Sequence, residues 1–285
     1  MIKGIIFDLD GTLADTIVDL QSAMNRMLSF IGYSERTITE IKSALNNGAT
    51  EFVRRSLPKE VQHVDFILRS ALREYEKQYS KCYLEKTEAY TNIEVMLMNL
   101  KQKGIKLAVL SNKHDKFVKD IVTELFDRKT FVEIQGHDKL PLKPNPSAAL
   151  AIAKKMGIKP SQCLFVGDSD VDIQTAKNAS MRSVGVSWGY RGHDALENAG
   201  ATFVVKEANE ICEIVDHLKT ENAKIRRSRA KDTIVHTTEN CPYYNRKLLG
   251  TTEHSIIKQS MTSETSNTKT MSVSGEHNAK KQKKN

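Results

Sequence analysis

Short apolar runs alternate with helical segments along much of the chain. The first run, residues 2–7, is nearly continuous, as expected of a strand buried on both faces of a parallel sheet. Further runs that indicate strands lie at 105–110, 131–134, 163–166, 183–186 and 203–205. Helical periodicity lies at 93–103, 115–125, 146–156, 171–179 and 207–218. This alternation predicts an α/β fold, a parallel sheet flanked by helices, with its ligand at the carboxyl ends of the strands.

A different pattern interrupts this alternation between residues 17 and 84. Apolar residues such as Leu20, Met24 and Met27 are spaced three and four apart there, and no strong strand signal occurs. We therefore expect an inserted all-helical cap at residues 16–85. The core, a Rossmann-like sheet, is expected to consist of residues 1–15 and 86–218.

The last part of the chain, residues 219–285, has neither pattern. It contains 14 Lys and Arg against 6 Asp and Glu, so the whole net charge of +8 lies there and the preceding residues are neutral. Few apolar residues remain to offset the entropy of ordering, which predicts a disordered, low-complexity basic tail. Its basic clusters at 226–231 and 280–284 could contact nucleic acid, an anionic membrane or an acidic partner. Because the body is neutral, we expect its activity to need no nucleic acid.

Cysteine usage and hydropathy indicate the compartment. Cys82, Cys163, Cys212 and Cys241 are far apart and form neither a metal-ligand spacing nor a disulfide framework, which favours a reducing environment. No signal peptide precedes the first apolar run, and no apolar segment reaches the roughly 18–20 residues of a membrane span. We expect a cytoplasmic protein without a transmembrane segment.

Polar residues follow four of the predicted strands or the loops after them, and this repetition is the strongest functional signal. The four groups are Asp8-Leu9-Asp10-Gly11-Thr12-Leu13, Ser111-Asn112-Lys113, Lys143-Pro144-Asn145-Pro146 and Gly167-Asp168-Ser169-Asp170-Val171-Asp172. Each alone has an ordinary interpretation: an Asp-Gly turn, a helix cap, a solvated loop lysine and acidic capping of a helix. Together they predict a common site at the carboxyl edge of the sheet.

The carboxylates in these groups indicate a metal site. Asp8 and Asp10 are two apart, so they point the same way in an extended segment, and the turn at Gly11 frees backbone N–H groups for an anion. Asp168 and Asp172 are four apart at a predicted helix start, which places both on one face with Asp170 turned away. Such an anionic cluster needs a cation, and oxygen ligands without a His or Cys cluster favour Mg²⁺ over zinc.

The remaining groups supply counter-charge and hydrogen bonds. Pro144 and Pro146 follow Lys143 and would hold this lysine rigidly, which suits a fixed counter-charge for phosphate and carboxylate. Ser111 and Asn112 offer a hydroxyl and an amide for phosphoryl oxygens.

The four groups, in this order and with a helical insertion between the first and second, resemble the haloacid dehalogenase superfamily in its helical-cap phosphatase branch. The resemblance covers about residues 1–218. Within it, residues 46–49 (Asn-Asn-Gly-Ala) and 185–190 (Gly-Val-Ser-Trp-Gly-Tyr) are similar to phosphoglycolate phosphatases. The first segment has the alternative of a simple turn between helices, and Trp188 and Tyr190 have the alternative of packing.

The resemblance implies a phosphatase that acts on a small phosphorylated substrate, with phosphoglycolate favoured. Asp8 would be the nucleophile that forms an aspartyl-phosphate, and Asp10 the general acid and base. Mg²⁺ would be held by the Asp8 carboxylate, the Asp10 backbone carbonyl and Asp168, with Asp172 behind them orienting a water or Lys143. The phosphoryl oxygens would meet Mg²⁺ and the residues Lys143, Ser111, Asn112, Gly11 and Thr12.

Other functions stay open from the sequence alone. A pyrophosphatase and a sugar-phosphate phosphatase or mutase keep the same core residues. A non-catalytic scaffold, or a polyanion-binding protein acting through the basic tail, belongs to a different class, and the intact set of carboxylates and Lys143 argues against the scaffold. The segment around Cys241 resembles the active-site turn of a glutaredoxin, but Tyr244 replaces the second cysteine and too few residues follow for that fold.

Overall fold

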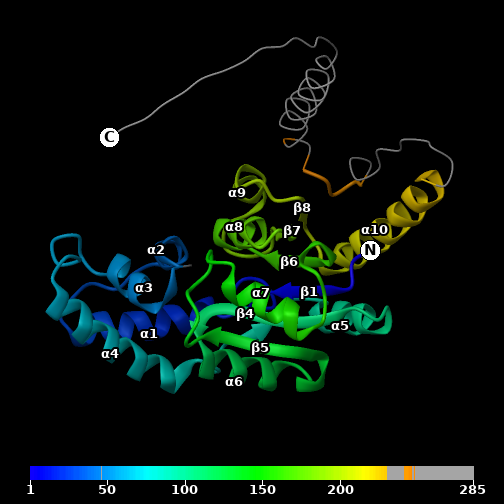
Figure 1. Cartoon of the computed structure of the whole chain (residues 1–285). Helices are drawn as coiled ribbons and strands as arrows, with labels where there is room; N and C mark the ends of the chain where they lie inside the picture. The colour runs from blue at the N-terminus through cyan, green and yellow to red at the C-terminus, as the bar shows by residue number, and fades with distance from the viewer. Residues whose placement is uncertain (46, 230–240, 246, 248–285) are drawn as a thin grey trace, which may run out of the picture. The chain divides into compact units, whose positions relative to one another are not determined.

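The computed structural model describes residues 1–45, 47–229, 241–245 and 247 (Figure 1). Its centre is a six-stranded sheet in the order β5-β4-β1-β6-β7-β8, and all neighbouring strands run parallel. The strands are β1 (Gly4–Phe7), β4 (Lys106–His114), β5 (Phe131–His137), β6 (Cys163–Gly167), β7 (Arg182–Val186) and β8 (Phe203–Val205). The predicted parallel α/β fold is confirmed.

Helices cover both faces of this sheet, and the alternation of side chains along β1 shows how. Ile5 and Phe7 belong to one hydrophobic cluster, whereas Ile6 belongs to another on the opposite face. The first cluster includes residues of α5 (Ile93–Gln102), α6 (Asp115–Leu125) and α10 (Ala208–Arg229). The second includes residues of α7 (Ser147–Lys155) and α8 (Asp170–Asn178), and α9 (His193–Asn198) packs beside α8. Two short 3₁₀ turns, Arg128–Thr130 and Pro160–Gln162, precede β5 and β6.

The cap is inserted between β1 and β4 and has a hydrophobic core of its own. Its helices are α1 (Ile17–Phe30), α2 (Ile38–Ala44), α3 (Gly48–Ser56) and α4 (Asp65–Cys82), and their buried side chains form one cluster. At its base, β2 (Ala14–Asp15) pairs antiparallel with β3 (Glu88–Ala89). Beside this ribbon, the buried Asp19 carboxylate accepts hydrogen bonds from the N–H groups of Lys86 and Thr87. Cap and core belong to one compact unit, Met1–Arg246.

Two parts of the predicted tail belong to this unit. Helix α10 continues beyond Leu218 to Arg229, and Glu221 is buried. Residues 241–245 lie against the edge strand β8, where Val204 donates a hydrogen bond to the Tyr243 carbonyl at 3.1 Å. An edge strand presents unpaired backbone groups, and this segment satisfies some of them. The boundary therefore differs from the predicted residue 219, while the basic cluster at 280–284 lies outside the described residues.

The cysteines and the hydropathy of the helices bear on the predicted compartment. All four cysteines are buried and unpaired. Within the described residues, each helix is too short or too polar to cross a membrane. A cytoplasmic location stays a prediction.

Candidate active site

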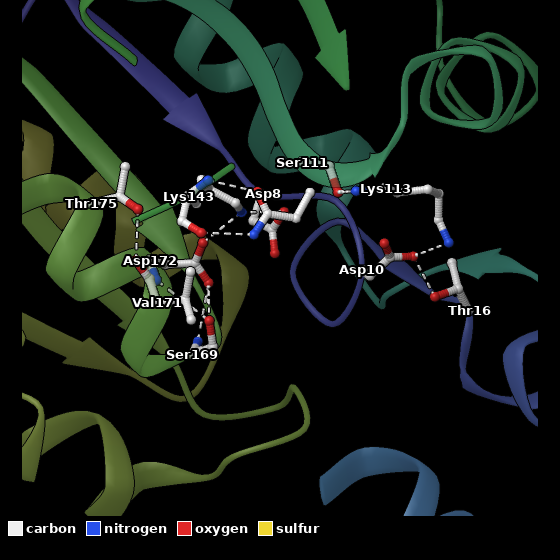
Figure 2. Close-up of polar contacts among 11 residues, drawn as sticks. Asp8, Asp10, Thr16, Ser111, Lys113, Lys143, Ser169, Val171, Asp172 and Thr175 are labelled. Carbon is white, nitrogen blue, oxygen red and sulfur yellow. Dashed lines mark hydrogen bonds and ion pairs between the residues drawn. The ribbon is translucent and has the colours of Figure 1, made fainter. Parts of the chain in front are cut away.

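The polar groups that follow the strands meet at the carboxyl edge of the sheet (Figure 2). Asp8 comes directly after β1, and its N–H donates to the Val166 carbonyl of β6 at 2.8 Å, which joins the two strand ends. Lys143 reaches this edge from the loop before α7, and its ammonium lies 2.7 Å from Asp8 Oδ1 and 2.7 Å from Asp172 Oδ1. All three side chains are buried.

Three buried carboxylates share this position with a single lysine. Oxygen atoms of Asp8, Asp168 and Asp172 lie within 4.8 Å of one another. Burial raises the pKa of Asp8 to about 7, with Lys143 opposing the rise and Asp172 adding to it. Burial, followed by repulsion from Asp172 and Asp8, also raises the pKa of Asp168 well above its usual range. Such raised values indicate carboxylates that lack sufficient positive charge in the chain alone.

The donor set fits a hard divalent cation. Asp168 Oδ1 is buried and has no hydrogen-bond partner in the described part of the chain, while Asp168 Oδ2 accepts the Tyr190 N–H at 2.7 Å. A buried carboxylate oxygen without a partner costs free energy unless a cation or donor faces it. Oxygen ligands of this kind suit Mg²⁺.

Asp172 holds Lys143 in place. Helix α8 starts at Asp170 with Ser169 as its cap, and the Ser169 hydroxyl donates to Asp172 Oδ2 at 2.6 Å. The other oxygen of Asp172 accepts from Lys143. The expectation that Asp168 and Asp172 share one helix face is wrong, because Asp168 lies in the loop before the cap; the loop still brings the two carboxylates together. Asp170 is exposed.

Asn112 was predicted to bind phosphoryl oxygens, but its side chain contacts the backbone of Lys143. Its Oδ1 accepts the Lys143 N–H at 2.7 Å, and its Nδ2 donates to the Lys143 carbonyl at 3.0 Å. The side chain predicted to reach phosphoryl oxygens therefore fixes the backbone of the lysine loop. Ser111 is buried beside it and lines the cavity.

The turn after β1 uses the amides that were predicted for an anion. The Gly11 N–H donates to the Ala14 carbonyl at 2.9 Å, and the Thr12 N–H donates to the Leu9 carbonyl at 3.2 Å. These two amides close the turn, which corrects the predicted role. The N–H groups of Leu9 and Asp10 have no such partner among the described residues, so the loop offers these amides instead. Gly11 has φ +78°, and a Cβ there would collide with the Asp168 carboxylate.

Asp10 lies apart from Asp8 and Asp172 (Figure 2), and its carboxylate does not belong to the group formed by Asp8, Asp168 and Asp172. Its Oδ1 accepts a hydrogen bond from the Thr16 hydroxyl at 2.5 Å and lies 2.9 Å from the Lys113 ammonium. The separate position of Asp10 agrees with the expectation that Asp8 is the nucleophile and Asp10 the general acid and base. The sequence alone suggested no function for Lys113, although this lysine directly follows Ser111 and Asn112 in the second group.

The segment after β7 contacts the first motif directly. Trp188 Nε1 donates to the Thr12 carbonyl at 3.1 Å, and the Thr16 N–H donates to the Tyr190 hydroxyl at 3.2 Å. These two aromatic residues therefore do more than pack. Their hydrogen bonds connect the loop after β7 to the turn that carries Asp10. Their place directly after a strand of the sheet was the available signal. In the other similar segment, residues 46–49, Asn46 lies outside the described residues, and Gly48 and Ala49 line the cavity.

A cavity of about 300 Å³ lies between the cap and this edge of the sheet. Asp8, Asp10 and Ser111 line its floor, and Phe52 and Tyr75 of the cap line it from the other side. The site is thus a partly enclosed chamber with carboxylates and a lysine at one end, as substrate sites in enzymes commonly are.

Comparisons with known proteins agree with this geometry. The model of the haloacid dehalogenase-like hydrolase family matches residues 5–186. The chain is 33% identical to a phosphoglycolate phosphatase of Pseudomonas putida, over 71% of this chain and 76% of that protein. It is also 33% identical to a phosphoglycolate phosphatase of Vibrio parahaemolyticus, over 75% of this chain and 96% of that protein.

Solved structures share the fold. A crystal structure of a predicted phosphoglycolate phosphatase from Haemophilus somnus is 28% identical, with a TM-score of 0.70, and the match covers 75% of this chain and 98% of that one. CbbY from Rhodobacter sphaeroides, at 22% identity and a TM-score of 0.61 over 74% of this chain and 96% of that one, shares the fold. On the family match, the chain belongs to the haloacid dehalogenase-like hydrolase family.

Proposed function

We propose that this chain is a magnesium-dependent phosphatase that hydrolyses a small phosphate monoester through an aspartyl-phosphate, with phosphoglycolate as the favoured substrate. The observation that carries the proposal is the buried group of Asp8, Asp168 and Asp172 around the single ammonium of Lys143. The names of the relatives favour phosphoglycolate among possible esters.

Asp8 and Asp168 are the residues that would hold Mg²⁺, together with the Asp10 backbone carbonyl. The partnerless Asp168 Oδ1 supports this set. When bound, the cation would neutralise the carboxylates and the charge that develops on the phosphoryl oxygens. Asp172 is already used by Ser169 and Lys143 and would act through the lysine.

In the first half of the reaction, an Asp8 carboxylate oxygen forms a bond to phosphorus while the bond from phosphorus to the ester oxygen breaks. The Asp10 carboxylic acid gives its proton to the leaving oxygen, so the alcohol departs neutral. In the second half, water attacks the phosphorus of the aspartyl-phosphate and Asp10 takes the water proton. Phosphate leaves, and the Asp8 carboxylate and the Asp10 acid are restored.

The remaining residues would stabilise the charged phosphoryl group. Lys143 lies 2.7 Å from Asp8 Oδ1, and so it is close to any phosphoryl group on that residue. The Ser111 hydroxyl and the amides of Leu9 and Asp10 would donate hydrogen bonds to the equatorial oxygens. Asn112 would contribute by fixing the Lys143 backbone.

A phosphate-release screen with and without Mg²⁺ tests the proposal. The panel contains phosphoglycolate, pyrophosphate, a nucleotide and sugar phosphates, with transfer between sugar positions measured to detect a mutase. We expect Mg²⁺-dependent release, highest with phosphoglycolate, and its loss in Asp8→Asn with the fold retained by circular dichroism. Substantial activity in Asp8→Asn would contradict the nucleophile assignment, and preference for another ester would change the substrate alone.

A further inference from the structure

We propose that Lys113 positions Asp10 for proton transfer, and that Tyr79 of the cap holds Lys113 in the position where it does so. The inference rests on the proposed phosphatase function. It gives the cap a direct part in acid–base chemistry in addition to enclosing the substrate.

The contacts of Lys113 bridge the core and the cap. Its ammonium lies 2.9 Å from Asp10 Oδ1 and donates to the Tyr79 hydroxyl at 2.6 Å. The ammonium also lies over the Tyr79 ring, 4.6 Å from its centroid. The Lys113 side chain is only 7% exposed, so water screens these contacts weakly. A partly desolvated lysine with a carboxylate, a hydroxyl and an aromatic face around it is firmly oriented.

These contacts select one oxygen of Asp10. Oδ1 receives both the Thr16 hydroxyl and the Lys113 ammonium. Oδ2 makes no hydrogen bond or ion pair within the described part of the chain, and Asp10 lines the cavity. Because Oδ1 is held from two directions, Oδ2 is the oxygen that carries the proton to the leaving group and takes one from water.

Tyr79 connects this arrangement to the cap. It lies on α4, stacks on Tyr75 with ring centroids 5.7 Å apart, and packs edge-on against Phe117 of α6 with centroids 5.0 Å apart. Tyr79 is thus fixed by cap and core together. A cap that is not seated on α6 would remove the hydroxyl and the ring face from Lys113 and loosen Asp10.

The end of β4 places Lys113 for this contact. The register between β4 and β5 shifts between Leu110 and His114, so Ser111, Asn112 and Lys113 lie in an irregular strand end. Such irregularities re-aim side chains near active sites. The alternative, that Lys113 binds a substrate anion, requires its ammonium to leave Asp10 and Tyr79, and the test below distinguishes the two.

The leaving-group dependence of turnover tests the inference. An alkyl phosphate needs a proton on its departing oxygen, whereas p-nitrophenolate departs without one. In Lys113→Met we expect the single-turnover rate of alcohol release from the alkyl ester to fall about 100-fold, in the range of general acid catalysis. The rate of the p-nitrophenolate burst should fall less than about 5-fold, because both rates report the first half of the reaction alone. KM should change little in both cases. Lys113→Arg should recover part of the loss, and Tyr79→Phe should show the same selectivity with a smaller effect.

Controls separate this outcome from others. Lys119→Met on α6 removes an exposed lysine that pairs with Asp115 and should leave both rates unchanged. A burst of p-nitrophenolate from Lys113→Met shows that the nucleophile is intact, and Tyr79→Phe keeps the test decisive if Lys113→Met folds poorly. Equal loss on both esters with a raised KM would overturn the inference in favour of substrate binding. Absence of phosphate release from the wild-type chain on any ester would instead overturn the proposed function itself.

Discussion

The ammonium of Lys143 lies 2.7 Å from Asp8 Oδ1, and both side chains are almost completely buried. Burial by itself lowers the pKa of Lys143, but Asp172 and Asp8 outweigh it and raise that pKa above the ordinary value. Lys143 therefore stays protonated throughout the pH range of an assay. It is a permanent positive charge facing the proposed nucleophile, and it opposes the rise that burial causes in the pKa of Asp8.

Replacing this charge by a neutral side chain of similar length should remove activity. In Lys143→Met we expect kcat to fall at least about 100-fold, the usual effect of losing one preorganised electrostatic contact. We also expect the metal-free protein to lose about 3 kcal/mol of unfolding free energy, because Asp8 and Asp172 stay buried without their partner. Phosphate release and denaturant unfolding measure the two effects. Lys154→Met, an exposed lysine on α7, is the control, and equal rates in the two variants would contradict the role of Lys143.

The raised pKa of Asp8 predicts how metal affinity depends on pH. A proton and a cation compete for the same carboxylate, and the pKa of Asp8 in the folded protein is about 7 against an ordinary value of 3.8. Below about pH 7 the apparent Mg²⁺ affinity should therefore rise with pH, by about tenfold per unit for one proton, and should level off above it. Asp168, whose pKa burial also raises, would steepen the slope.

Thermal unfolding with and without Mg²⁺ checks this dependence. Between about pH 4 and 7 the folded, metal-free protein holds a proton on Asp8 that the unfolded chain has lost, so its stability should fall as the pH rises. The increase in Tm caused by Mg²⁺ should consequently be small at pH 5.5 and large at pH 8. An increase of the same size at both values would show that Asp8 does not titrate in competition with the metal.

Strand-end carboxylates were the predictable part of the site. The carboxyl ends of parallel strands share one edge, so apolar runs followed by Asp8 and Asp168 already place these residues together. The distant contacts were not predictable, because they depend on which side chains the packed cap and loops bring near. Two examples are the hydrogen bond from the Lys86 N–H to Asp19 and the contact between Lys113 and Tyr79. Neither contact leaves a periodic signal in the sequence.

Turn chemistry caused the main errors within the first motif. A glycine after an aspartate signals a turn, but the signal does not say which amides the turn consumes. Gly11 and Thr12 donate within the turn, so the available amides belong to the two residues before them. The side chain of Asn112 likewise found a backbone partner at Lys143, 31 positions away in sequence.

Gly189 is expected to be as sensitive as the acidic residues, although it carries no side chain. A Cβ there would collide with the Asp168 side chain and with the Gly11 carbonyl. Gly189→Ala should therefore displace both the carboxylate and the turn, and abolish Mg²⁺-dependent phosphate release. Gly157→Ala is the matched control: its φ of +68° makes alanine strained by about 1 kcal/mol, but nothing lies near its Cβ. Gly157→Ala should lower Tm slightly and keep full activity. An active Gly189→Ala would contradict the prediction, because it would show that Asp168 and the Gly11 turn can shift without loss of function.

The segment at 241–245 should contribute to the stability of the sheet, although the composition of its surroundings predicted a disordered tail. Cys241 is buried in the main hydrophobic cluster, and the Tyr244 ring packs edge-on against Phe203 of β8 with centroids 6.3 Å apart. The Asn245 N–H donates to the Thr202 carbonyl at 3.1 Å, which adds to the backbone bond between Val204 and Tyr243.

A chain that ends after Arg229 loses these contacts, whereas a chain that ends after Lys247 keeps them. We expect the shorter chain to be less stable by about 2–3 kcal/mol, from the lost burial, ring contact and hydrogen bonds. The chain that ends after Lys247 should have the same stability as the full chain. Urea unfolding compares the three proteins, and phosphate release at low temperature confirms that each one folds. The same midpoint in both truncated chains would mean that β8 gains nothing from its cover, because water satisfies the exposed edge equally well.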